Sequence, residues 1–261
     1  MSVRFAWPAV LIAVLATVLT AAPARAAAAP VRVMTFNICG NVCRHGEVTA
    51  TAGNIAYQIR ARHVGVAMLQ EVCYTQFLGI RARLARYGYT AVFGRADRGG
   101  RCDDHDRRHG VGFGVALLAR GTMTGAAVRP LPGPASAERR ILLAATVRTG
   151  GRTLYAVTTH TAPGGPALAL QMAAVRRFVT PIAASRPVLF GGDLNSLPDS
   201  TDLNGFYAAL READSRTDPR PTFATVPRKI DYLFAGRLRP RAAAVARTPY
   251  SDHRMYLGVF G

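Results

Sequence analysis

Hydrophobic and polar residues follow two different periods along the chain. Short runs rich in Val, Leu and Ile predict strands, and longer stretches with apolar residues three or four positions apart predict helices. The predicted strands lie at 31–37, 64–71, 111–119, 139–148, 153–160, 187–193, 230–235 and 254–260. The predicted helices lie at 49–62, 74–86, 166–180 and 202–213, and Pro181 is expected to end the third. The glycine-rich, charged segment 94–110 is predicted to be a loop.

Strands and helices are mixed without strict β-α-β alternation, which favours an α+β fold. We expect two packed, mainly antiparallel sheets with helices on their outer faces, a four-layer α/β/β/α sandwich. No Pro/Ser-rich linker and no internal repeat divides residues 27–261, so a single domain is predicted there. We also expect this domain to be a monomer.

The first 26 residues have the pattern of a signal peptide. Arg4 precedes an apolar run at 9–19, and Ala24-Arg25-Ala26 matches a small-x-small cleavage site. The alternative is an uncleaved membrane anchor, but the run is shorter than the ~20 residues that a spanning helix needs. The pattern predicts an extracellular protein with no stable membrane insertion after cleavage.

Four cysteines remain after that site. In an exported protein an even number of cysteines indicates disulfides, and three pairings are open. We favour Cys39–Cys43 and Cys73–Cys102, because each bond would close a loop near a strand end. A zinc site is the alternative, although no tight Cys-x-x-Cys pair is present.

The chain is strongly basic. It has 33 Lys and Arg residues against 15 Asp and Glu, a formal net charge of +18, and Lys229 is its only lysine. Arginine forks match phosphate oxygens, so this balance favours a polyanionic partner such as nucleic acid. A genome rich in G and C also inflates the arginine content, and the charge by itself does not separate these explanations.

Several predicted strands end on a polar residue. These residues are Asn37, Glu71, His160, Asp193 and Asp231. A titratable group is costly within the core but meets solvent at the end of a strand. Five such ends could therefore converge at one edge of the sandwich and form a site.

These residues lie in motifs whose order and spacing are specific. The motifs are Gln70-Glu71, Thr159-His160-Thr161-Ala162-Pro163, Gly191-Gly192-Asp193-Leu194-Asn195-Ser196, Lys229-Ile230-Asp231-Tyr232-Leu233-Phe234 and Ser251-Asp252-His253. From about Val31 to Phe260 the chain resembles the endonuclease/exonuclease/phosphatase superfamily. That superfamily includes pancreatic-type deoxyribonucleases, abasic-site endonucleases, neutral sphingomyelinases and inositol polyphosphate 5-phosphatases.

The resemblance implies a divalent-metal site. Residues matching Glu71 and Asn37 help to hold the metal in the family, and Asp252 offers a further oxygen nearby. Hard cations such as Mg²⁺ prefer oxygen ligands, with Mn²⁺ and Ca²⁺ as alternatives. We therefore expect Asn37, Glu71 and Asp252 to form the metal site.

The resemblance also implies the catalytic residues. His253 is expected to pair with Asp231. Asp193 and Asn195 are expected to position the attacking water and to bind phosphate oxygens. His160 is expected to donate a hydrogen bond to the phosphate. Either Asp193 or His253 could take the proton from water, and we favour His253.

The resemblance also places Arg140 where related enzymes have a phosphate-contacting arginine, with Arg139 as a near-equal candidate. Two departures from the family leave the substrate open. Pancreatic-type deoxyribonucleases support the histidine matching His160 with a second glutamate, for which we find no counterpart. Abasic-site enzymes have tyrosine in place of His160.

Three functions are therefore considered. The first is a secreted, metal-dependent phosphodiesterase that cleaves DNA or RNA. The second is a lipid or small-molecule phosphodiesterase or phosphatase, for which a membrane-contacting apolar loop is missing after residue 31. The third, a binding protein that has kept the fold, is disfavoured because every core residue is present.

Overall fold

The structure of the protein is a computed structural model. It describes residues 1–3, 28–98, 102, 112–135 and 137–261. Residues 4–26 of the predicted signal peptide and most of the predicted loop 94–110 therefore lie outside the described residues.

Two six-stranded sheets pack face to face. The first sheet has the order β11-β12-β1-β2-β4-β3 and the second β5-β6-β7-β8-β10-β9. The strands of the first sheet are β1 (Val31–Asn37), β2 (Val66–Cys73), β3 (Tyr89–Asp97), β4 (Phe113–Arg120), β11 (Pro240–Ala246) and β12 (Met255–Phe260). Those of the second are β5 (Thr122–Pro130), β6 (Ile141–Thr149), β7 (Arg152–His160), β8 (Val188–Asp193), β9 (Arg211–Glu212) and β10 (Asp231–Gly236).

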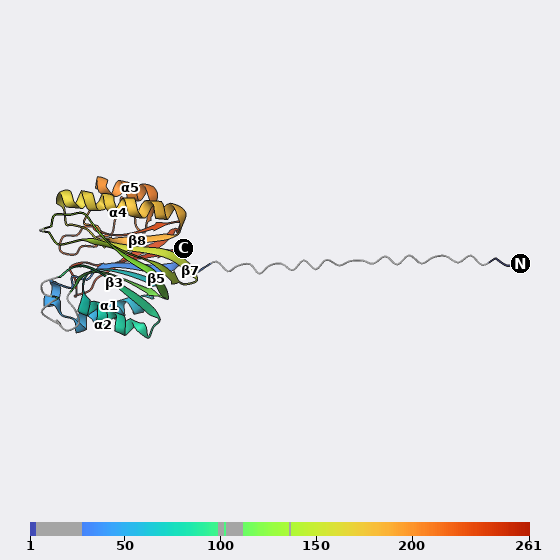
Figure 1. The fold of residues 1–261 in the computed structure, drawn as a ribbon, viewed down its shortest axis with the longest axis horizontal. Helices are drawn as coiled ribbons and strands as arrows, with labels where there is room; N and C mark the ends of the chain where they lie inside the picture. The colour runs from blue at the N-terminus through green and yellow to red at the C-terminus, as the bar shows by residue number, and fades with distance from the viewer. Residues whose placement is uncertain (4–27, 99–101, 103–111, 136) are drawn as a thin grey trace.

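Helices cover the outer face of each sheet (Figure 1). On the first sheet lie α1 (Thr49–Ala61) and α2 (Tyr74–Ala85), and on the second lie α4 (Gly165–Ser185) and α5 (Asn204–Ala209). Two short 3-10 helices, η1 (Cys43–Gly46) and η2 (Thr201–Leu203), lie in connections. The predicted α/β/β/α sandwich is confirmed.

The largest apolar cluster lies between the sheets. Met68 and Leu117 of the first sheet pack there with Leu143 and Leu189 of the second. Two further clusters fill the spaces between each sheet and its helices. Because strands buried on both faces show no alternation, the central strands read as continuous apolar runs in the sequence.

Each sheet contains one parallel pair. β1 pairs with β2 and β7 pairs with β8 in parallel, and a helix joins each pair, while the other pairings are antiparallel. Parallel strands end at the same edge, so Asn37 lies beside Gln70 and His160 beside Asp193. β10 begins opposite the end of β8, with Asp231 beside Asp193. We call this edge the polar rim.

Four strands were not predicted, and all of them are edge strands. β3 and β11 border the first sheet, and β5 and β9 border the second. Residues 94–97, predicted to be loop, belong to β3. Edge strands bury little of their surface, and β5 and β11 contain no fully buried residue, so the apolar signal on which the prediction relied is weak there.

Two helix predictions were wrong in extent. α4 continues through Pro181 to Ser185, because the proline is on the exposed side while Val179 and Ala183 stay packed on the second sheet. The segment predicted as a helix over 202–213 is η2, the short helix α5 and the edge strand β9. Among the described residues, no helix is both long and apolar enough to cross a membrane.

Candidate active site

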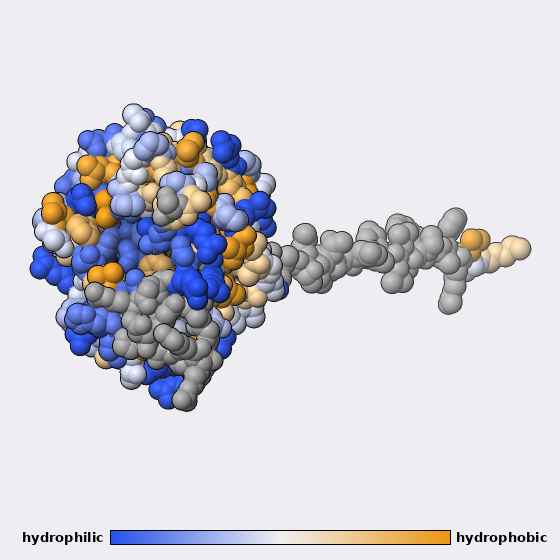
Figure 2. All heavy atoms as spheres, turned by 60° about the vertical axis from the view of Figure 1, so that its left-hand side comes forward, coloured by the Kyte–Doolittle hydropathy of each residue, from blue (hydrophilic) through white to orange (hydrophobic). Residues whose placement is uncertain are grey.

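The polar rim joins residues from both sheets. The Nδ2 group of Asn37, at the end of β1, donates to Glu71 Oε1 at 2.8 Å and to Asp193 Oδ2 at 3.0 Å. Asp193 ends β8 of the other sheet, so one amide holds two carboxylates that are 122 positions apart in the sequence. Figure 2 brings the rim end forward and shows hydrophilic side chains around a hollow in this face.

Glu71 reaches the rim because its backbone departs from the strand. Its φ is +54°, and the pairing of β2 with β4 shifts register between Leu69 and Val72. A bulge of this kind turns a side chain away from the regular alternation. Glu71 is therefore half-buried between fully buried neighbours, and burial raises the pKa of its carboxyl while the hydrogen bond from Asn37 lowers it.

Two disulfides follow the strands that carry Asn37 and Glu71. The structure forms Cys39–Cys43 and Cys73–Cys102, as predicted. The N–H of Cys39 also donates to Asn37 Oδ1 at 2.9 Å, which fixes that side chain. The two sulfur atoms near Asp252 are bonded to each other, so they offer no thiolate to a metal, and the zinc alternative is not supported.

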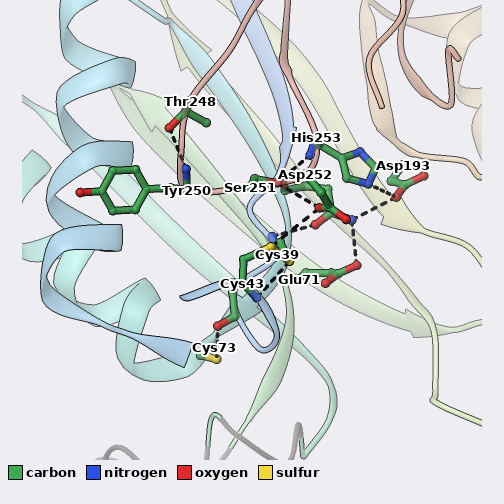
Figure 3. The surroundings of a disulfide bond; sticks show 12 residues. Cys39, Cys43, Glu71, Cys73, Asp193, Thr248, Tyr250, Ser251, Asp252 and His253 are labelled. Atoms are coloured by element: carbon green, nitrogen blue, oxygen red, sulfur yellow. Dashed lines mark hydrogen bonds and ion pairs between the residues drawn. A yellow bond between two sulfur atoms is a disulfide. The ribbon is translucent and has the colours of Figure 1, made fainter. Parts of the chain in front are cut away.

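His253 and Asp231 form the predicted pair, with 2.9 Å between Nδ1 and Oδ2. Two residues that the sequence analysis gave no role hold it in place. Thr222 Oγ1 accepts the N–H groups of Ile230 and Asp231. Ser251 Oγ accepts the N–H of His253 at 2.9 Å and donates to the carbonyl of Asn37 at 2.8 Å (Figure 3). Ser251 was quoted only as part of a motif, and no sequence signal marked Thr222.

The charges around this pair shift two pKa values upward. Burial alone would lower the pKa of His253, but the charge and hydrogen bond of Asp231 and the charge of Asp193 outweigh it and raise that pKa to about 10. Burial and the charge of Asp231 raise the pKa of Asp193 to about 7. Near neutral pH His253 is therefore protonated, and Asp193 is the group able to exchange a proton.

His160 is held as a neutral donor. Its Nδ1 atom lies within hydrogen-bond distance of the Arg140 guanidinium, and because a guanidinium only donates, Nδ1 must accept. The ring proton is then on Nε2, which is 3.4 Å from Asp193 Oδ2. Burial, Arg140 and His253 all lower the pKa of His160. Among the described residues, Arg140 is thus the side chain that contacts Nδ1 of His160.

The two candidate arginines separate clearly. The Arg140 side chain is 10% exposed and also contacts Glu138 at 3.0 Å. The Arg139 side chain is 69% exposed and lies 3.7 Å from Asp97. Arg140 therefore belongs to the rim, whereas Arg139 lies beside it in solvent.

Asn195 and Asp252 complete the set of residues expected at the rim. Asn195 has a φ of +48°, its N–H donates to Asp193 Oδ1 at 3.1 Å and its Nδ2 to the Thr161 carbonyl at 3.0 Å. Asp252 lies near Glu71, and its charge raises the pKa of that residue (Figure 3). Every predicted site residue except Arg139 thus meets at one place, while the role of each stays a prediction.

Gln70 was quoted from the sequence only as part of a motif, and the structure gives it a role. Its Oε1 accepts from Thr35 Oγ1 at 3.2 Å, and its Nε2 donates to Thr158 Oγ1 at 3.0 Å. All three residues are fully buried, and Thr158 is in the second sheet. This hydrogen-bonded bridge ties the two sheets together directly beneath the rim.

The rim offers oxygen ligands that suit a hard divalent cation. Glu71 and Asp252 present carboxylate oxygens near one another, and Asp193 lies beside Glu71 through the shared amide of Asn37. Oxygen ligands of this kind are those that Mg²⁺ and Ca²⁺ prefer. Asn37 directs its Nδ2 group at the carboxylates and so orients Glu71. The Oδ1 atom of Asn37 accepts the N–H of Cys39, so binding a cation through Oδ1 would require the amide to turn.

Comparison with known proteins identifies the family. Residues 34–253 match the model of the Endonuclease/Exonuclease/phosphatase family. No curated protein matches the sequence. Similar solved structures include the human Nocturnin catalytic domain with bound sulfate anion, at 22% identity and a TM-score of 0.73, covering 89% of this chain and 93% of that one.

Two other structures extend the range of relatives. The endonuclease/exonuclease/phosphatase from Beutenbergia cavernae is 25% identical with a TM-score of 0.73, covering 89% of this chain and 71% of that one. ANGEL2, a 2′,3′-cyclic phosphatase, is 16% identical with a TM-score of 0.69, covering 88% and 95%. Because the family model spans most of the chain, this protein belongs to the endonuclease/exonuclease/phosphatase family, whose members are hydrolases acting on phosphoester bonds.

Proposed function

We propose that this protein is a secreted, divalent-metal-dependent phosphodiesterase that cleaves nucleic acid. The observation that carries the proposal is the meeting of Glu71, Asp193, His160 and His253 at one rim, around a single amide from Asn37. One site therefore contains carboxylates that suit a cation, an acceptor for the proton of water and hydrogen-bond donors for a phosphate.

The side chains suggest a division of labour. Asp193, with a pKa raised to about 7, accepts the proton of the attacking water. His160 Nε2–H and the protonated His253 donate to phosphate oxygens as negative charge develops. Bound by Glu71 and Asp252, a divalent cation would supply Lewis-acid activation of a phosphoryl oxygen and stabilise the leaving oxygen.

This division gives the proton-accepting role to Asp193, the alternative that the sequence left open beside His253. His253 was favoured as the acceptor of the proton, but Asp231 stabilises the imidazolium form through a 2.9 Å contact. A histidine that is already protonated at neutral pH is a better donor than acceptor. Asp193 therefore takes the role of base in the proposal, with His253 as the acid.

Nucleic acid is favoured as substrate because the chain carries a formal charge of +18, almost entirely as arginine. Polyanion binding is driven largely by phosphate contacts and the release of counterions. Secretion is supported by the two disulfides, since such bonds persist mainly in oxidising compartments.

A substrate panel tests the proposal. Purified protein is incubated with single- and double-stranded DNA, RNA, sphingomyelin vesicles, sugar phosphates and a 2′,3′-cyclic nucleotide, with Mg²⁺, Mn²⁺ or Ca²⁺ and with chelator. We expect metal-dependent cleavage of DNA or RNA with little release of phosphate from small esters. Absence of nucleic-acid cleavage under every condition would reject the proposal.

The alternative is a phosphatase or phosphodiesterase for small molecules or lipids. Solved structures with this fold include a mannosyl-6-phosphatase, at 14% identity, and a 2′,3′-cyclic phosphatase. Faster turnover of a small ester than of any polynucleotide would select it. The lipid version is less favoured, because the exposed large apolar residues in the described chain do not form one loop.

A further inference from the structure

The end of the sandwich opposite the polar rim, which we call the basal end, includes six short connections. They are 62–65, 86–88, 121, 150–151, 186–187 and 237–239. The strand registers place them together, since Tyr89 pairs with Arg120, Thr149 with Arg152, and Gly236 with Val188. The C-terminus also lies at this end (Figure 1).

Arginine lies in or directly beside every one of these connections. The residues are Arg62, Arg86, Arg120, Arg152, Arg186, Arg237 and Arg239. None of the six connections, and no residue flanking them, is Asp or Glu. Within the part of the chain that the structure describes, none of these arginines makes an ion pair with a carboxylate. A general enrichment in arginine would not by itself remove every acidic side chain from these connections.

Two of these arginines, Arg86 and Arg120, line a groove together with Arg60. One hollow of about 610 Å³ is lined by Arg60, His63, Arg86, Tyr87 and Arg120. A second of about 330 Å³ shares His63 and Arg120 with the first, so the two adjoin. The backbone that forms their floor is fixed, because the N–H of Arg120 donates to the Gly65 carbonyl at 2.9 Å and that of Gly121 to the Gly88 carbonyl at 2.9 Å.

An aromatic ring lies within this groove. The guanidinium of Arg60 is 5.1 Å from the centroid of the Tyr87 ring, and that of Arg86 is 4.9 Å from it. Tyr57 lies nearby on α1 with 56% of its surface exposed. Basic side chains that follow a backbone, together with aromatic rings on which bases stack, are the features of surfaces that bind single-stranded nucleic acid.

A negatively charged membrane is the main competing partner. Membrane-binding surfaces combine basic residues with exposed apolar side chains that enter the lipid. At the basal groove Tyr57 is the one such side chain among the exposed large hydrophobic residues of the described chain. The composition of the groove therefore favours a polynucleotide.

We infer that the basal groove is a second binding surface for single-stranded nucleic acid, distinct from the catalytic rim. A nine-residue strand separates the two ends by ~30 Å, so one polynucleotide could contact both only if it is longer than that. The groove would hold a long substrate near the rim without taking part in hydrolysis. The choice of nucleic acid as the occupant rests on the proposed function.

The test compares two triple variants with equal charge change. The basal variant carries Arg60→Glu, Arg86→Glu and Arg120→Glu, and the control carries Arg129→Glu, Arg176→Glu and Arg177→Glu, all at exposed positions. Binding of a labelled single-stranded oligonucleotide longer than the molecule is measured by anisotropy in EDTA over a range of salt. Hydrolysis of bis(4-nitrophenyl) phosphate with Mg²⁺ is measured separately.

We expect the basal variant to lose at least tenfold in oligonucleotide affinity, with the control close to wild type. The salt dependence should fall by about 2 in log–log slope, since each lost phosphate contact on a single strand contributes ~0.7. Equal loss in both variants, or no loss in either, would overturn the inference. The inference would also be overturned if the basal variant lost binding to phosphatidylserine vesicles but kept its affinity for the oligonucleotide.

Hydrolysis of the small ester separates this inference from the proposed function. The basal variant should hydrolyse it at the wild-type rate, because the substituted residues are remote from the rim. If wild-type protein hydrolyses no phosphodiester, the proposed function fails, while the oligonucleotide binding data still decide whether the basal groove exists as a nucleic-acid surface.

Discussion

The two ends of the sandwich treat charge in opposite ways. At the polar rim Asp193 and Asp231 are almost completely buried, and histidines and an amide hold them in fixed contacts. At the basal end the arginines are mostly exposed and have no acidic partner in the described residues. Burying a charge is costly unless it is paired. At the rim the carboxylates lose contact with water, and their fixed partners hold them in a defined geometry.

The connections differ in the same sense. Basal connections contain four residues or fewer. The rim connections are longer, and they include the segment that follows β1, the segment that follows β8 and the loop 213–230 that precedes β10. Both disulfides lie at the rim end, after β1 and β2. The short basal turns need no covalent support, while the rim combines long loops with buried like charges.

The largest effect is expected from removing the rim histidine. His253→Ala should lower kcat by ~10²–10⁴-fold, the usual contribution of acid–base help. His63→Ala, at the exposed basal end, is the matched control and should keep the wild-type rate. Rates on bis(4-nitrophenyl) phosphate, which is too small to reach the basal groove lined by His63, measure the contrast, with circular dichroism to establish folding. A well-folded His253→Gln variant with less than a tenfold loss would contradict the role given to this residue.

The disulfides should differ in their effect on stability. Cys73–Cys102 links residues 29 positions apart and Cys39–Cys43 residues 4 apart. Loop entropy then predicts losses of roughly 3.5 and roughly 2 kcal/mol in the free energy of unfolding when each pair is replaced by serine. Denaturant titrations of the two double variants provide the measurement, and a larger loss for the short loop would show that the entropic account fails here.

Asn37→Ala should weaken divalent-cation binding by ~10–100-fold, because the amide orients Glu71 and Asp193 as an outer-shell partner would. Titration of Mn²⁺ by calorimetry measures this. Asn54→Ala, on α1 away from the rim carboxylates, serves as control. Unchanged affinity in Asn37→Ala would mean that the rim carboxylates are held by other contacts.

A smaller effect should appear in the pH dependence of the cation-free protein. The folded pKa of Asp193 is raised from 3.8 to about 7, so stability falls as the pH rises through that window. The folded pKa of His253 is raised from 6.5 to about 10, so its stabilisation is complete below 6.5 and is lost as the pH approaches 10. Melting temperatures should therefore decline from about pH 4 to 10, and Asp193→Asn should flatten the lower part. A stability that rises over this range would refute these assignments.

The sequence predicted the buried parts of the fold and missed its margins. Central strands such as β2 and β8 are continuous apolar runs whose ends coincide with polar residues, so both the strands and the site followed from one pattern. The edge strands β3, β5, β9 and β11 carry little apolar signal because few of their own side chains are buried. The end of α4 was misplaced because packing of Ala183 overrides the cost of Pro181.

At the site, residue types were predictable and their orientation was not. The motifs indicated that His160, Asp193 and His253 would converge, but not that Arg140 fixes the ring proton of His160. That relation depends on a contact between neighbouring strands whose register no local pattern encodes. The same holds for Thr222, whose hydroxyl supports the backbone of Asp231 from a separate loop.

The central claim is that the rim hydrolyses phosphodiesters with the help of a divalent cation. Its most direct test is the initial rate of phosphodiester cleavage by chelator-treated protein, measured while Mg²⁺ is added back, in parallel with Glu71→Gln. The account predicts no activity without the cation, saturable recovery for the wild type, and recovery only at much higher Mg²⁺ for the variant. Undiminished cleavage in excess chelator, or identical Mg²⁺ dependence in the two proteins, would contradict it.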